Sequence, residues 1–301
     1  MLARVLFMAV LTAAVAPQAA ADDTEALRRT WLERVAISAA DKICNLFSEG
    51  ERLALASGIY QAEGELLRAG KKRAELQRLS AQVTEHAQGL GCNHAEVISV
   101  AATVRDSYRQ FARTSFLEYP APRSTWSASR SEHDRWAASQ TDKATGIVFG
   151  LRRIPGKPDQ SRLAIAMPAR GVTPASAQLV FRDQEKMSEP WFGSLSGKSD
   201  KLAPAPRAAS RIAWAGKVMS GRNEVGDPIW IFTFDAGVID ALEQLDPREA
   251  IQVNLLPAPR AKDQKMKSII YEIGDFRAAR AFSMIPKTEG AAPVETASAA
   301  H

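Results

Sequence analysis

A glycine-rich segment at residues 193–199 has the composition of a phosphate-binding loop. It reads Gly-Ser-Leu-Ser-Gly-Lys-Ser, so a lysine and a serine follow a glycine as they do in nucleotide-binding P-loops. A P-loop needs four residues between its glycines so that backbone N–H groups surround the phosphates, but Gly193 and Gly197 are separated by three. A Pro-rich run at residues 203–206 stands where a P-loop opens a helix. We therefore expect a surface loop and no nucleotide cofactor.

Serine-based hydrolysis has no recognisable motif in this chain. Leu195 occupies the position between Gly193 and Gly197 that a nucleophilic serine takes in hydrolase elbows. No serine is followed three residues later by a lysine. If the protein is a hydrolase, its site is assembled from residues that are scattered along the chain.

The four histidines are spread too widely to indicate a metal site. His86 falls in a helical pattern, His94 begins another, His133 lies between two acidic residues and His301 ends the chain. Zinc sites usually take His or Cys ligands in close, regular spacing. We expect no metal.

A group of carboxylates near residue 235 could in principle serve a glycosidase, which needs a pair of carboxyl groups at a defined separation. The candidates are Asp227, Asp235, Asp240 and Glu243. Asp235 is positioned to cap a short helix, and Asp240 and Glu243 fit its polar face. We expect these carboxylates to have structural roles.

The only two cysteines, Cys44 and Cys92, are 48 residues apart. If the chain enters an oxidising compartment, we predict one disulfide between them. Closing a loop of that length would stabilise the fold by up to about 4 kcal/mol in the chain-entropy account. Two buried, unpaired thiols are the alternative.

The first residues have the pattern of a secretory signal peptide. Arg4 precedes an uncharged, mostly apolar run at residues 5–15, and small residues lead to Ala21 before two aspartates. The run is shorter than the roughly 20 residues of a membrane-spanning helix. We expect cleavage after Ala21, no transmembrane segment in the mature chain and a periplasmic or secreted location. An uncleaved membrane anchor is the alternative.

Residues 22–118 repeat apolar side chains every three to four positions, as amphipathic helices do. Four helices are predicted: the first is capped by Asp22, the second and third end before Gly70 and Gly91, and the fourth is capped by Asn93. The first carries the stripe Leu27, Trp31, Val35, Ala39, Ile43 and Phe47. We predict a disulfide-tied antiparallel helical bundle that folds independently of the rest of the chain.

The pattern changes at Tyr119. Residues 119–144 are rich in Pro, Ser and Arg and are expected to form an irregular linker. The pattern of residues 145–285 predicts a mostly antiparallel β domain with two short helices that begin after Asp235 and Asp275. Residues 286–301 are predicted to form a disordered tail. The fold class is α+β. Strands are predicted at 146–151, 163–167, 178–181, 212–219, 229–234, 251–256 and 268–273, and that at 212–219 should bury Ile212, Trp214 and Val218.

Basic residues are concentrated in the first half of the β domain. Residues 152–222 hold 13 Lys and Arg against five Asp and Glu, whereas residues 22–118 hold 13 against 14. Such an excess can attract acidic surfaces in a salt-dependent way, although a mixed, solvated surface is the alternative. The predicted anion-binding residues are Arg207, Arg211, Lys217 and Arg222. Nucleic acid is not expected as a partner, because it fits poorly with export.

The segment from Ile229 to Met284 resembles the closing unit of bacterial periplasmic β domains of the invasion-associated locus B type. The resemblance rests on a strand, a short helix with Ala241-Leu242, the Leu245-Asp246-Pro247 turn, two more strands and the run from Gly274 to Ala279. That family carries cysteines in its β domain, whereas this segment has none. The resemblance implies an exported β domain without known catalysis. The whole chain also resembles exported proteobacterial proteins of unassigned function.

These patterns predict a non-catalytic periplasmic protein without a cofactor, whose partner is an envelope component or another periplasmic protein. Two alternatives stay open. The first is a periplasmic hydrolase with a site assembled from scattered residues, for which His86 is one candidate. The second is a structural assembly factor that uses the helical stripe as an oligomer surface.

Overall fold

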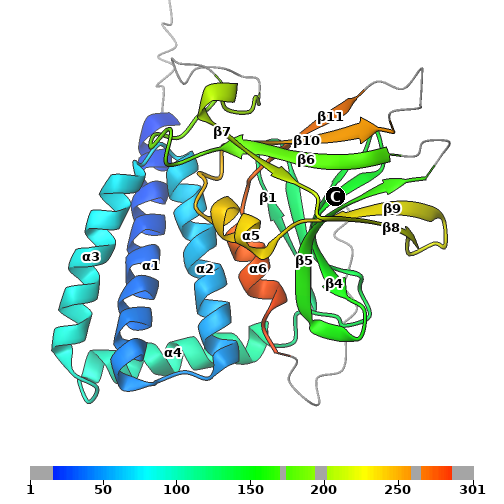
Figure 1. Ribbon diagram of the computed structural model, residues 1–301. Coiled ribbons are helices and arrows are strands. Elements are labelled where there is room, and N and C mark those ends of the chain that lie inside the picture. The colour runs from blue at the N-terminus through cyan, green and yellow to red at the C-terminus, as the bar shows by residue number, and fades with distance from the viewer. Residues whose placement is uncertain (1–15, 170–173, 194–201, 259–265, 287–301) are drawn as a thin grey trace, which may run out of the picture.

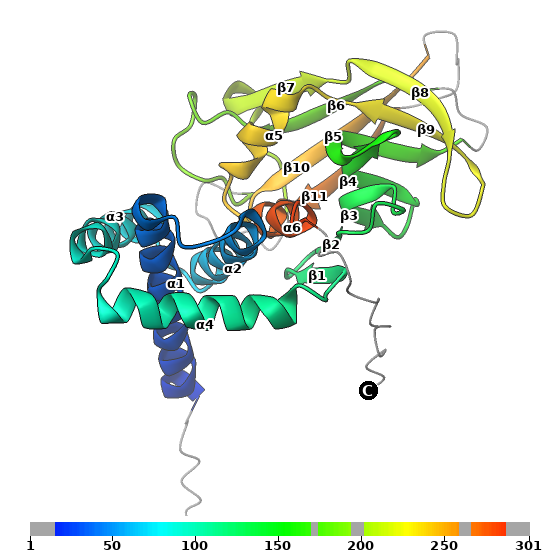
Figure 2. The same ribbon diagram turned by 90° about the horizontal axis from the view of Figure 1, so that it is seen from below.

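The computed structural model describes residues 16–169, 174–193, 202–258 and 266–286. Three long helices stand side by side, a fourth crosses beneath them, and two antiparallel sheets pack face to face beyond them (Figure 1). A short helix, α6, lies between the helices and the sheets (Figure 2). The predicted α+β class, with a helical region followed by a β region, is confirmed.

The helical region follows from the amphipathic periods of the sequence. Its helices are α1 (Ala16–Cys44), α2 (Glu49–Arg68), α3 (Arg73–Leu90) and α4 (Ala95–Phe111). Ser48 and Glu51 form a capping box that starts α2, since each side chain accepts from the other's backbone N–H. The glycines after α2 and α3, Gly70 and Gly91, have positive φ angles of 91° and 80° as expected at helix ends.

Cys44 and Cys92 form the predicted disulfide, with 5.4 Å between their Cα atoms. The bond joins the end of α1 to the turn that precedes α4. Helix α2 runs antiparallel to α1 and α3, which run in the same direction, and α4 crosses the lower ends of all three (Figure 1). The bundle therefore has three parallel axes and one transverse helix.

Two predicted helix starts are wrong. Helix α1 begins at Ala16 and continues through Asp22, so it includes the last residues of the predicted signal peptide, while residues 1–15 lie outside the described part. Helix α4 has His94 as its N-cap, without a side-chain hydrogen bond, so Asn93 does not cap it. Asp22 is inside α1, and His94 takes the N-cap position for which Asn93 was predicted.

The expected linker at residues 119–144 is also wrong, because most of it is strand. Strand β1 (Phe116–Pro120) pairs with β2 (Thr125–Ser129), which pairs with β3 (Trp136–Asp142). Trp126 and Ala128 of β2 are fully buried while the intervening Ser127 is not. The serines conceal a period of two, and the strand forms because its apolar face is covered by other elements.

The two sheets have seven and four strands. The larger sheet has the order β1-β2-β3-β4-β5-β9-β8 and the smaller has β11-β10-β6-β7, and every pair is antiparallel. The remaining bounds are β4 (Ile147–Ile154), β5 (Lys157–Pro168), β6 (Pro174–Arg182), β7 (Ser210–Trp214), β8 (Lys217–Arg222), β9 (Pro228–Thr233), β10 (Ala250–Pro257) and β11 (Lys267–Glu272).

The strand predicted at residues 212–219 is divided between the two sheets. The chain leaves the smaller sheet at Ala215, whose N–H donates to Ala177, and enters the larger at Gly216, whose N–H donates to Thr233. Ile212 and Trp214 are 45% and 54% exposed, so the prediction that they are buried is wrong. The sequence correctly indicated that side chains of β7 alternate between two faces. The face that carries Ile212 and Trp214 is exposed, and the other face packs inward.

The main core lies between the sheets and under the two predicted short helices, α5 (Ala236–Glu243) and α6 (Phe276–Ser283). Asp235 and Asp275 stand at their N-cap positions, although neither side chain makes a capping bond. Three residues of α2 pack against this core: Leu53, Ala54 and Tyr60. The helical and β regions therefore share packed surface, which argues against the independent folding that the sequence suggested.

Helices α2 and α6 approach closely because α2 presents a glycine to α6. A Cβ on Gly64 would overlap the Asp275 carboxylate. Asp275, 5% exposed, accepts two hydrogen bonds from Arg68 of α2, at 3.0 and 2.9 Å. This ion pair fixes the register between the helical and β regions.

A second polar contact lies along the same interface. Glu63 of α2 forms ion pairs with Arg73 at 3.0 Å and with Arg277 of α6 at 3.2 Å. The Arg277 guanidinium lies 3.9 Å above the ring centre of Tyr60. Arg73 also donates to the Leu245 carbonyl at 3.3 Å. The interface is thus held by charge pairs around a packed apolar centre.

Candidate functional site

The structure does not bring the four predicted anion-binding residues together. Arg207 lies in a short 3-10 helix before β7 and Arg211 lies on β7, at the edge of the smaller sheet. Lys217 and Arg222 stand at the two ends of β8, at the edge of the larger sheet. Five residues of extended strand separate that last pair by roughly 16 Å. All four side chains are exposed.

A different group of arginines converges on the larger sheet. The arginine cluster consists of Arg135, before β3, Arg152 on β4, Arg162 on β5 and Arg222 on β8. Arg135 donates to the Arg222 carbonyl, and Arg152 lies directly opposite Arg162 in the β4–β5 register. Of the predicted residues, only Arg222 belongs to the cluster.

Arg152 is the recessed member of the arginine cluster. Its guanidinium lies 5.7 Å from the ring centre of Trp136, and its buried Nη1 has no hydrogen-bond partner among the described residues. Burial and then the charge of Arg135 lower the pKa of Arg152, while Glu224 acts in the opposite direction. Because a buried donor without an acceptor is costly, this position is suited to an oxyanion.

Like charges on directly opposite residues of antiparallel strands are destabilising. Arg152 and Arg162 are such a pair. Among the groups that act on the pKa of Arg152, Glu224 is the single carboxylate, and it favours the charged form. Guanidinium groups bind carboxylate and phosphate through paired hydrogen bonds, so the arrangement can hold an anion with several oxygens.

Sequence reasoning missed Arg135, Arg152 and Arg162. The signal that was available is the turn at Gly156, around which Arg152 and Arg162 fall on facing strands of one hairpin. The contributions of Arg135 and Arg222 depend on strands far apart in sequence. Local pattern alone does not reveal them.

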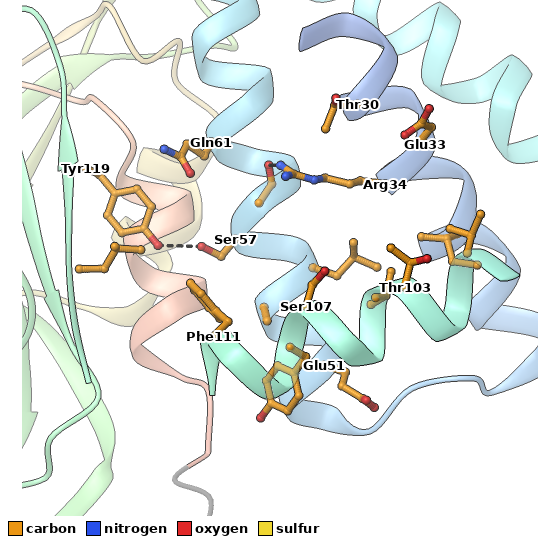
Figure 3. Close-up of a pocket in the computed structure, with 18 residues that line it drawn as sticks. Thr30, Glu33, Arg34, Glu51, Ser57, Gln61, Thr103, Ser107, Phe111 and Tyr119 are labelled. Carbon is orange, nitrogen blue, oxygen red and sulfur yellow. Dashed lines mark hydrogen bonds between the residues drawn. The ribbon is translucent and has the colours of Figure 1, made fainter. Parts of the chain in front are cut away.

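A cavity of about 450 Å³ lies between α1, α2, α4 and β1 (Figure 3). Arg34 of α1 reaches across to α2 and donates to the Gly58 carbonyl at 2.9 Å. The apolar part of the wall is formed by Ile37, Ala54, Leu55, Val100, Val104, Phe111 and Leu117. The volume falls within the range of about 300–1,000 Å³ that small-molecule sites span.

Ser57 is a buried polar residue of this cavity, 3% exposed, and its hydroxyl is already engaged. It lies 2.8 Å from the Tyr119 hydroxyl and donates to the Ala278 carbonyl at 3.1 Å. Burial raises the pKa of Tyr119 to about 12, so the phenol stays protonated at neutral pH and is a poor base. Ser57 therefore joins the helical region to β1 and α6 and is not activated as a nucleophile.

The other candidate chemistry is dispersed. Asp240 and Glu243 both face Arg280, at 4.0 and 2.7 Å, while Asp227 lies in the exposed turn between β8 and β9. His86, His94 and His133 are exposed, and no group of three or more potential metal ligands occurs within the described ranges. Residues 194–199 of the glycine-rich segment and His301 lie outside the described residues.

Within the described part of the chain, no helix is long and apolar enough to cross a membrane. Comparisons with protein families, with curated proteins and with solved structures found no match.

Proposed function

We propose that this protein is a non-catalytic binding protein of the bacterial cell envelope, exported by a signal peptide cleaved after Ala21, and that the arginine cluster binds an anionic envelope component. The disulfide is consistent with an oxidising compartment such as the periplasm. The resemblance of the C-terminal segment to periplasmic β domains points the same way.

The observation that carries the proposal is the buried, unpaired donor Arg152 Nη1, which has Arg135 close enough to lower its pKa and Arg162 directly opposite on the paired strand. Because Arg152 is half-buried beside Trp136, an anion must project from its carrier to reach it. Carboxylate groups on flexible peptide stems of the cell wall can project in this way, whereas a flat lipid surface would meet mainly the exposed arginines. We therefore favour a wall polymer over a membrane.

Co-sedimentation with purified cell-wall sacculi and with phosphatidylglycerol vesicles, each at low and high salt, tests this function. We expect binding to sacculi that salt weakens, because exposed charge interactions are screened. Loss of two charge-assisted contacts in Arg152→Gln/Arg162→Gln should weaken binding about five- to thirtyfold, from roughly 1–2 kcal/mol. Arg113→Gln, an exposed arginine after α4, is the matched control and should bind normally.

Two results would contradict the proposal. One is an absence of binding to sacculi by the folded wild-type protein at low salt. The other is equal weakening by Arg113→Gln and by the cluster variant, which would indicate net charge and not a site. Binding to vesicles alone would replace the wall polymer with a lipid headgroup as the partner.

Arg207, Arg211 and Lys217 remain predicted contributors to long-range attraction. Because they lie outside the arginine cluster, Arg207→Gln/Arg211→Gln should reduce binding less than the cluster variant does. A larger loss in this variant would place the contact surface at the edge of the smaller sheet, as the sequence alone suggested.

The two alternative functions make separate predictions. A hydrolase would turn over peptidoglycan or an ester, and the turnover would disappear when a specific residue of the responsible cavity is changed to alanine. An assembly factor would sediment as an oligomer, for which Ile43 and Ile98, 58% and 55% exposed, are available apolar contacts.

A further inference from the structure

A second hollow, of about 650 Å³, lies where the edge strand of the smaller sheet meets the first three strands of the larger one. β11 contributes Ile270 and Tyr271, and the β1–β2 turn and β3 contribute residues that include Ser124 and Gln140. It is separate from the helical cavity and shares no residue with the arginine cluster. Its volume also falls within the range of about 300–1,000 Å³ for small-molecule sites.

The base of the hollow contains an amide whose hydrogen bonds are half satisfied. Gln140 is 2% exposed, and its Nε2 donates to the Glu272 carbonyl at 2.8 Å. That bond fixes the orientation of the amide, and Oε1 is then buried without a hydrogen-bond partner in the described structure. The hydroxyl of Ser124 is buried without a partner in the same way. Buried polar atoms are almost always paired, so two of them lining one hollow require an explanation.

The surroundings hold Gln140 rigidly. Trp126 Nε1 donates to the Ile273 carbonyl at 2.7 Å, and the Tyr271 hydroxyl donates to the Ile147 carbonyl at 2.9 Å. Together with the Gln140 bond, these contacts tie β11 and the residue after it to the larger sheet. The base is therefore preorganised, which lowers the cost of ordering the site when a ligand binds.

The chemistry of the walls selects the class of ligand. An amide oxygen accepts a hydrogen bond, so a bare phosphate or carboxylate cannot satisfy Gln140 Oε1. The rim carries Glu118 and Asp142 against Arg123 and Lys143, so neither sign of charge dominates. Three further residues that carry hydroxyl groups, Thr125, Ser127 and Thr141, also line the hollow.

From this arrangement we infer that the hollow binds an uncharged, polyhydroxylated ligand, namely a segment of a neutral glycan, with one sugar hydroxyl donating to Gln140 Oε1. Sugar hydroxyls both donate and accept, so such a ligand can offer a donor to Gln140 and an acceptor to Ser124. This inference does not depend on the proposed function, because it uses a different site and a ligand of different charge.

Titration of the purified protein, expressed from the full chain, with neutral tetrasaccharides tests the inference. The probes are chitotetraose, cellotetraose and maltotetraose, followed by calorimetry and by the NMR signals of the Gln140 side-chain NH₂ group. We expect at least one tetrasaccharide to bind, with affinity that salt does not change, and to shift the Gln140 signals. Ser124→Ala should weaken that binding about two- to tenfold, the effect of one neutral hydrogen bond.

The Ser124 hydroxyl has no hydrogen-bond partner in the free protein, so Ser124→Ala removes a bond to the ligand without breaking one within the protein. Ser220→Ala, at an exposed position of β8, is the matched control and should leave affinity unchanged. Absence of binding by all three probes, or binding that leaves the Gln140 signals unmoved, would overturn the inference. A bridging water between Gln140 and Ser124 that no probe displaces would also overturn it. A shift of the same signals by ethanolamine alone would reject the glycan and assign a cationic ligand.

Discussion

Replacing Arg68 by methionine should destabilise the whole protein, because it leaves a buried carboxylate without its cation. The Asp275 side chain is 2% exposed and that of Arg68 is 15% exposed. Methionine keeps part of the apolar stem and removes the guanidinium with both of its hydrogen bonds. Removing one partner of a buried ion pair typically costs about 3–5 kcal/mol. We expect about 3 kcal/mol, the lower end of that range, because Arg68 retains some contact with solvent.

Urea denaturation followed by circular dichroism and by tryptophan fluorescence measures this loss. The far-ultraviolet signal reports mainly the helices, whereas five of the six tryptophans, including the fully buried Trp126, lie in the β region. Since α2 and α6 form one interface, both probes should shift together in a single transition. The loss corresponds to a fall in melting temperature of about 6–12 °C.

The double variant Arg68→Met/Asp275→Asn separates the charge from the packing. Removing the carboxylate as well should restore part of the lost stability, since no uncompensated charge remains. Arg109→Met is the control, because its ion pair with Asp106 is exposed and should contribute nothing resolvable. Two separate transitions, with the fluorescence transition unmoved in Arg68→Met, would refute the reasoning.

The pH dependence gives a second check on Asp275. Burial raises the pKa of Asp275 above its ordinary value of 3.8, although Arg68 acts to lower it. In Arg68→Met the opposing influence is absent, so this pKa should rise further. Because the protonated carboxyl needs no cation, the destabilisation should be largest at neutral pH. It should shrink as the pH falls through the raised pKa of Asp275.

Three further predictions concern the covalent link, the sheet and a second carboxyl group. Cys44→Ser/Cys92→Ser should lower the free energy of unfolding by up to about 4 kcal/mol, measured by urea denaturation, and no change would show that the bond adds nothing. Gly150→Ala should destabilise by about 1–3 kcal/mol or more, because its Cβ would overlap the Ala138 carbonyl of the paired strand; a normal melting curve would contradict this. Burial raises the pKa of Glu272, so its contribution to stability is present at low pH and lost as pH rises through that pKa. Glu272→Gln should therefore raise the free energy of unfolding, relative to wild type, more at pH 7 than at pH 4. Paired denaturation curves measure this, and an equal change at both pH values would refute it.

The elements that were predictable are those whose signal is local. The periods of the helices, the cysteine pair and the positions of α5 and α6 each depend on neighbouring residues, and all are present in the structure. The strands β1 to β3 were missed because serines in β2 conceal its alternation. Their stability comes from Trp126 and Ala128 packing into a core built by later strands.

The candidate sites were less predictable than the fold, because each is made by pairing distant segments. Only Arg222 of the arginine cluster was predicted. The other three arginines lie on or next to its sheet only through four successive pairings, β3–β4, β4–β5, β5–β9 and β8–β9. Gln140 gave no signal in the sequence, since an amide becomes informative only when burial leaves one of its atoms without a partner.

The sequence by itself determined the local periods, the covalent link between Cys44 and Cys92 and the concentration of basic residues in the β region. Only the tertiary structure decided which face of each strand is buried. Ile212 and Trp214 show this, because alternation marks two faces without saying which one meets the core. The tertiary structure also decided that α2 docks on α6 and that Arg135 and Arg162 lie beside Arg152. These arrangements depend on contacts between segments far apart in the chain, whose energies no local window of sequence contains.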